Sequence, residues 1–236
     1  MPDEMSDSPW LIEQVVPLDQ HSSELLDSRL GRRARRGLAV LDAPTLAVSL
    51  RELTIHDNRK WFGEADVRLD ALVVHGHGAV GEPDSFYTPH TFRFARVGDE
   101  DPLPIGESGL LFFYGRPLYF LDLFLTASRS REDSDDLSGY LAQGLGDPSL
   151  KDAFGDLAGL VVAPHVAAVT AALQAAARIG EFAYQVLRRV TGSTVGLFHT
   201  SWLEHRDGFG LGRHPEQGAF RVKDLSFAYE ITVEKE

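Results

Sequence analysis

The sequence predicts an α+β fold: a mainly antiparallel β-sandwich with a helical insertion that contains one long helix. Three observations predict it. Segments of alternating apolar and polar residues begin near residue 46, which is typical of strands with one solvated face. A long helical repeat follows, and strand-like segments return before the C-terminus. Strands on both sides of a block of helices indicate one β-rich domain that the helices interrupt.

A chain of 236 residues has the length of one large domain. We assign residues 1–40 to an N-terminal extension and residues 41–236 to a single sandwich-like domain, with the helical insertion at about 136–191. The first nine residues are acidic and rich in turn formers, unlike a signal peptide. No segment reaches the ~18 apolar residues that a membrane-spanning helix needs. We therefore expect a cytoplasmic protein.

The first half of the chain contains the clearest strand signals. In the cleanest of them Ala65, Val67 and Leu69 alternate with polar residues, and we expect the polar side chains Arg68 and Asp70 to face solvent. A Gly-Arg-Pro sequence at 115–117 predicts a hairpin turn between two aromatic-rich strands. The strands expected in this half are 46–55, 65–74, 91–97, 110–114 and 118–126.

The clearest helix is predicted over about 164–190. Pro164 lies near its start and Gly192 follows its end, as is common for helices. Apolar and small residues recur every three or four positions along one face, and we expect this face to pack on the sheet or on a neighbouring helix. Oligomerisation or partner binding through the same face is the alternative. The residues of this face are Val166, Val169, Leu173, Ala176, Gly180, Ala183, Leu187 and Val190.

Strand-like segments return at 194–204 and 219–233. The second of these is expected to form one long strand, with a slip in its alternation at Lys223 and Asp224. A glycine-rich loop lies between the two segments.

The charge of the chain is uneven. It carries 35 acidic and 23 basic side chains, for a net charge of −12, and residues 61–160 alone hold 17 acidic against 7 basic groups. Such a field disfavours nucleic acid and anionic membranes and suits a cation or a basic partner. The chain has no cysteine, which excludes disulfides, thiolate zinc sites and a cysteine nucleophile.

Two acidic turns offer oxygen ligands to a hard cation such as calcium. Solvated loop carboxylates are the alternative interpretation. The sequences Leu-Thr-Ile-His-Asp at 53–57, Phe-Leu-Asp-Leu-Phe-Leu-Thr at 120–126 and Asp-Asp-Leu-Ser-Gly at 135–139 resemble the calcium- and lipid-binding C2 family, over about residues 46–145. The resemblance implies an eight-stranded antiparallel sandwich and calcium as a cofactor. The ligands it implies are Asp57, Asp133, Asp135 and Asp136.

A second candidate metal site consists of His75 and His77. Alternation along a strand places both imidazoles on one face, a usual arrangement for two nitrogen ligands. His56 or His90, together with Asp57, would complete a site for zinc or iron. The alternative is a flexible turn, because glycine follows each histidine.

The glycine-rich loop after 194–204 is the candidate partner-binding segment. Tryptophan, phenylalanine and arginine are enriched at interaction hot spots, and a structural cap on a hairpin is the alternative. A serine turn at 106–109 does not fit the pattern of a hydrolase nucleophile, so we assign no catalytic residue. The residues of the candidate patch are Trp202, Arg206, Phe209, Arg213 and His214.

These features favour a non-catalytic binding or regulatory module that acts through protein–protein contacts and assists a separately encoded enzyme. A membrane-active effector or pore former that needs activation is one alternative, although membrane contact is not indicated by the charge. A metal-dependent hydrolase that uses histidine and carboxylate ligands is the other. We expect a protein partner and no nucleic-acid partner.

Overall fold

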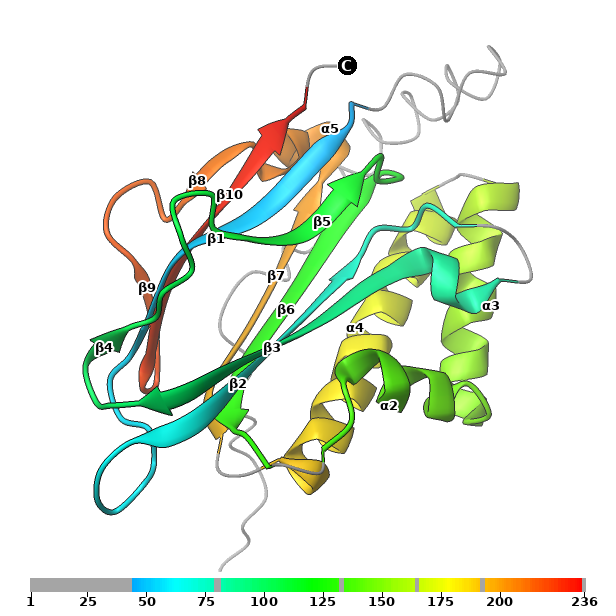
Figure 1. The fold of residues 1–236 in the computed structure, drawn as a ribbon. Coiled ribbons are helices and arrows are strands. Elements are labelled where there is room, and N and C mark those ends of the chain that lie inside the picture. The colour runs from blue at the N-terminus through cyan, green and yellow to red at the C-terminus, as the bar shows by residue number, and fades with distance from the viewer. Residues whose placement is uncertain (1–43, 79–81, 132–133, 164–165, 192–193, 235–236) are drawn as a thin grey trace, which may run out of the picture.

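The computed structural model of the chain describes residues 44–234, apart from 79–81, 132–133, 164–165 and 192–193. The predicted N-terminal extension and Asp133 lie outside the described residues. The described part forms three layers: two antiparallel sheets face each other, and helices cover the outer face of one sheet (Figure 1). The predicted α+β class and the mainly antiparallel sheets are confirmed.

The first sheet joins the two ends of the described chain. Its central strands β1 and β10 are antiparallel, with Leu46 opposite Val233 and Ile55 opposite Leu225. The strand order is β4-β1-β10-β8, and β5 also pairs with β1 while β9 also pairs with β10. Its members are β1 (Leu46–Ile55), β4 (Asp101–Pro102), β5 (Leu110–Gly115), β8 (Gly212–His214), β9 (Phe220–Val222) and β10 (Leu225–Val233).

The second sheet carries the helices. Its strand order is β3-β2-β6-β7, and every pair is antiparallel. A short 3-10 turn, Pro83–Phe86, leads into its edge strand β3. Its members are β2 (Ala65–Val74), β3 (Tyr87–Val97), β6 (Phe120–Arg129) and β7 (Thr194–Leu203).

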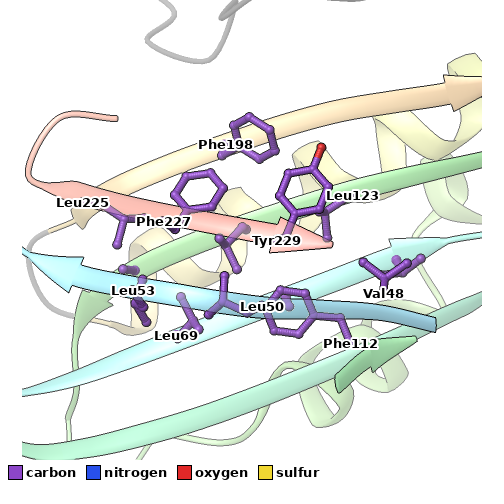
Figure 2. Close-up of a cluster of buried hydrophobic side chains, with 14 of the residues drawn as sticks. Val48, Leu50, Leu53, Leu69, Phe112, Leu123, Phe198, Leu225, Phe227 and Tyr229 are labelled. Atoms are coloured by element: carbon purple, nitrogen blue, oxygen red, sulfur yellow. The ribbon is translucent and has the colours of Figure 1, made fainter. Parts of the chain in front are cut away.

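The core between the two sheets is built from alternate residues of the strands. Leu69 of β2 and Leu123 of β6 point from the second sheet toward Leu50 of β1 and Phe227 of β10 (Figure 2). Each of these four side chains is buried. Removing such apolar surface from water is the main driving force for stacking two sheets.

The opposite face of the second sheet is covered by three helices, α2 (Leu137–Gly144), α3 (Pro148–Val162) and α4 (Val166–Val190). They lie between β6 and β7 in the chain, as the predicted insertion does. The apolar face of α4 packs on the sheet and on α3, so the packing interpretation of this helix is confirmed for its described side chains. A small residue is needed at Gly180, because a Cβ there would lie 2.0 Å from the Phe124 ring.

The helices also bury polar side chains of β2, so the prediction that one face of this strand is solvated is wrong. Arg68 is 0% and Asp70 2% exposed. The guanidinium donates from Nε to Asp70 Oδ2 at 2.6 Å and from a terminal nitrogen to Oδ1 at 2.8 Å. Alternation correctly separated the two faces of β2, but both faces are covered. A bidentate ion pair satisfies the charges that this burial removes from water.

The segment after the glycine-rich loop also differs from the prediction. It forms two antiparallel strands, β9 and β10, and not one long strand. Lys223 has a φ of 56°, and the chain reverses at Lys223 and Asp224, where the alternation slips. In the described part of the chain, no helix is long and apolar enough to cross a membrane.

Candidate functional site

Three of the four predicted calcium ligands lie in the described ranges, and each accepts a hydrogen bond from another protein group. Asp57 Oδ1 accepts from the backbone N–H of Arg59 at 2.7 Å, and Asp136 Oδ1 accepts from Arg93 at 2.5 Å. Asp135 accepts from Arg68 through its carbonyl oxygen at 2.5 Å. Within the described ranges, no three His, Cys, Asp or Glu side chains are grouped to hold a metal ion. Calcium binding stays a prediction, since Asp133 lies outside those ranges.

The predicted histidine pair is oriented by its own turn. His75 is 8% exposed, and its Nδ1 lies 3.3 Å from the backbone nitrogen of His77, which donates to it. Burial, assisted by the neighbouring His77, lowers the pKa of His75 to about 4. His56 lies elsewhere, with its ring nitrogens 2.6 Å from Glu100 and 2.6 Å from Ser226. The structure therefore does not bring His56 to this pair.

The predicted partner-binding loop packs as a cap on the sandwich. It contains α5 (Glu204–Asp207) and a 3-10 turn, Gly208–Gly210. Phe209 is 2% exposed and belongs to the core between the sheets. Trp202 donates its indole N–H to Tyr229 at 3.2 Å, and its ring is 4.5 Å from that of His214. Arg213 donates to Glu52 at 2.6 Å. Trp202, Arg213 and His214 are half-buried, and Arg206 is exposed.

Exposed aromatic side chains gather instead on the loop between β1 and β2, the cyan loop at lower left in Figure 1. Trp61 is 88% and Phe62 79% exposed, the highest values for large hydrophobic side chains in the described part of the chain. Their ring centroids are 6.1 Å apart in an edge-to-face arrangement. We call these two residues the aromatic tip.

The base of this loop is held by Asn58, which is 0% exposed. Its side-chain amide donates to the carbonyls of Val97 at 2.8 Å and Gly63 at 2.9 Å, and its backbone N–H donates to Asp99 at 2.8 Å. Its side-chain oxygen accepts from the backbone N–H of Lys60 at 2.8 Å. The bonds to Val97 and Asp99 tie the loop to the end of β3 and to the β3–β4 connection, and the bonds with Lys60 and Gly63 hold the two ends of the loop together. The aromatic tip is therefore presented on a constrained loop.

An open hollow of about 720 Å³ lies beside the aromatic tip. It is formed where the β1–β2 loop meets β3 and the end of β6, and we call it the loop-base hollow. Arg96 and Arg129 are its guanidinium groups, and Lys60 adds an ammonium group. Its lining residues are Lys60, Gly63, Glu64, Ala65, Asp66, Arg96, Arg129 and Ser130.

A second polar cluster lies on the helix-covered face of the second sheet. Asp122 Oδ1 lies 2.6 Å from His199 Nε2 and accepts from the Ser201 hydroxyl at 2.5 Å. The other oxygen of Asp122 is buried and has no hydrogen-bond partner in the part of the chain that the structure describes. Both the serine and the histidine contact the carboxylate, whereas a serine nucleophile must contact the histidine. The cluster thus lacks the order of a catalytic triad.

The aromatic tip was not predicted from the sequence, in which the acidic turns, the histidine pair and the glycine-rich loop were the candidate sites. Its signal is visible in the sequence: Arg-Lys-Trp-Phe-Gly at 59–63 places two consecutive aromatic residues in the connection between two strands. Comparisons with protein-family models, with curated proteins and with solved structures find no match to this chain. The candidate site is therefore defined by its own geometry, and it consists of the aromatic tip and the loop-base hollow.

Proposed function

We propose that the chain is a non-catalytic binding module that acts through protein–protein contact and regulates or assists a separately encoded enzyme. The observation that carries the proposal is the exposure of two adjacent aromatic side chains, Trp61 at 88% and Phe62 at 79%. Aromatic residues are enriched at the buried centres of protein interfaces, and tryptophan is among the most frequent hot-spot residues. A partner with an apolar pocket would remove both rings from water.

The constrained loop supports the same proposal. The four hydrogen bonds of Asn58 hold the loop before any partner arrives. Binding therefore needs little additional ordering of the backbone, and ordering is one of the main costs of association. The net charge of −12 favours a protein partner over an anionic membrane.

Site-specific photo-crosslinking tests this proposal. A benzophenone amino acid replaces Phe62 in one variant and Val162, which is 71% exposed at the end of α3, in a matched control. In cells of the source organism we expect a discrete adduct with one protein from position 62 and none from position 162. The substitution Trp61→Ala in the position-62 variant should abolish the adduct.

Two results would contradict protein binding at the tip. One is an adduct that forms equally from both positions or survives Trp61→Ala. The other is the absence of an adduct together with sedimentation on liposomes that Trp61→Ala and Phe62→Ala prevent, which would assign the tip to a membrane.

A further inference from the structure

We infer that the loop-base hollow binds an oxyanion, a phosphate or carboxylate group that the protein partner carries. The assignment to a partner rests on the proposed function, whereas binding of the oxyanion itself can be measured without any partner. The inference depends on two arginines whose charges are not neutralised within the described residues.

Fourteen arginines lie in the described ranges, and Arg96 and Arg129 differ from the seven of them that pair with a carboxylate. Neither guanidinium forms an ion pair among the described residues, and Arg129 donates to the backbone carbonyl of Arg59 at 3.4 Å. Residues 61–160 contain 17 acidic groups and only 7 basic ones, so carboxylates are plentiful nearby in sequence. The ion pairs between described residues involve Arg51, Arg59, Arg68, Arg93, Arg178, Arg206 and Arg213.

The carboxylates that line the hollow leave a net positive charge there. Asp66 Oδ1 accepts from the backbone N–H of Arg96 at 2.9 Å, so this bond is to the backbone of Arg96 and not to its guanidinium. Lys60 Nζ donates to the backbone carbonyl of Glu64 at 2.5 Å, which leaves the ammonium charge uncompensated. Three cationic and two acidic side chains line the hollow, so the balance is +1 in a chain of net charge −12.

Guanidinium groups suit an oxyanion because their fork of N–H donors matches the geometry of phosphate and carboxylate. Ser130 lines the same hollow and adds a hydroxyl that can donate. The hollow also lies next to the aromatic tip, since Lys60 and Gly63, which line it, flank Trp61 and Phe62 in the chain. A partner segment with an apolar residue beside a phosphate or carboxylate would engage both features together.

Nuclear magnetic resonance of the arginine Nε–Hε groups tests the inference with inorganic phosphate and with O-phosphoserine as probes. We expect the signals of Arg96 and Arg129 to move saturably, and the double variant Arg96→Gln/Arg129→Gln to weaken binding at least roughly tenfold, equivalent to about 1.4 kcal/mol. The control Arg188→Gln/Arg189→Gln removes the same charge from the exposed last turn of α4. It should change affinity by less than about twofold.

Absence of a saturable shift at about 10 mM probe, a concentration well above a millimolar Kd, would overturn the inference. Equal weakening by the two double variants would also overturn it, because it would indicate attraction by overall charge. The single variant Arg129→Gln provides the same comparison if the double variant does not fold. Binding to phosphatidylserine vesicles that needs both arginines, without binding of either free probe, would reassign the hollow to a lipid surface.

The two proposals fail in different ways. If Trp61→Ala abolishes crosslinking but phosphate still shifts the two arginine signals, both proposals stand. If wild type does not bind phosphate but position 62 still crosslinks, the oxyanion site is wrong and the proposed binding module stands. Phosphate binding without any position-62 adduct would leave the oxyanion site and remove the protein partner.

Discussion

The β1–β2 loop and the loop between β7 and β8 have similar side chains and opposite exposures. The first contains Arg59, Trp61 and Phe62; the second contains Arg206 and Phe209, and Trp202 lies just before it at the end of β7. In the first loop Trp61 and Phe62 are 88% and 79% exposed, whereas in the second Phe209 is 2% exposed. The presence of aromatic residues in a loop thus does not indicate whether the loop is a binding surface.

Backbone geometry separates the two loops. Phe209 has a φ of 63° and lies between Gly208 and Gly210, whose φ values of 56° and 66° are also positive. This run of left-handed residues turns the Phe209 ring into the core, and Gly210 leaves room for the indole of Trp202. In the β1–β2 loop, Asn58 holds the backbone through hydrogen bonds, and the two rings are left in solvent.

The largest expected effect tests the difference between the two loops by substituting the phenylalanine of each. Phe209→Ala should lower the free energy of unfolding by about 3–5 kcal/mol, because it leaves a cavity in the sandwich core. Phe62→Ala should change it by no more than about 0.5 kcal/mol, because the ring is already in water. Urea denaturation monitored by circular dichroism measures both. Equal effects of the two substitutions would contradict the assignment of one ring to the core and the other to the surface.

A second prediction extends the comparison to the buried ring of His75. Its pKa of about 4 lies below the ordinary value of 6.5, so between these pH values the unfolded chain binds more protons than the folded chain. Stability should therefore fall as the pH decreases from 6.5 to 4, by up to about 3 kcal/mol from this group. The measurement is the free energy of unfolding at pH 7, 6 and 5, for wild type and for His75→Gln.

The glutamine does not titrate, so the variant should lose this part of the pH dependence while other groups keep theirs. Parallel curves for wild type and His75→Gln would show that His75 has an unshifted pKa and is accessible to solvent.

The smallest expected effects come from substituting the two glycines beside Phe209. Gly208→Ala should cost about 1 kcal/mol, because an L-residue with positive φ is strained, while nothing lies within 4 Å of the added Cβ. Gly210→Ala should lower the free energy of unfolding by about 2 kcal/mol or more, because the added Cβ would also lie 2.4 Å from the Trp202 ring, a steric clash in addition to the backbone strain. Thermal unfolding of both variants tests this order. The reverse order would show that Trp202 does not cover Gly210.

Much of the architecture was predictable because the period of apolar residues is a local property. Alternation over 65–74 matches β2, and the helical repeat of 164–190 matches α4. The hairpin predicted at 115–117 is wrong, because β5 pairs with β1 in the first sheet whereas β6 pairs with β2 and β7 in the second. The hairpin at Lys223 was missed because a lysine with positive φ has no sequence signature comparable to glycine. The burial of Arg68 was missed because alternation distinguishes two faces of a strand without showing what covers each.

The candidate site was less predictable than the fold. The aromatic residues of both loops are visible in the sequence, but their exposure depends on contacts with distant segments. Phe209 packs against the sandwich core, and Asn58 bonds to Val97 of another strand. The loop-base hollow joins residues of three segments, with Lys60, Arg96 and Arg129 brought together only by the sheets.

The sequence by itself determined most of the strands, the long helix, the place of the insertion and the excess of acidic charge, because each depends on residues close together in the chain. The resemblance to C2 domains and its calcium ligands stay predictions. Only the tertiary structure decided which aromatic side chains reach solvent and which arginines have no carboxylate partner among the described residues. Exposure and charge pairing depend on every segment that packs around a side chain, and these segments are distant in the sequence.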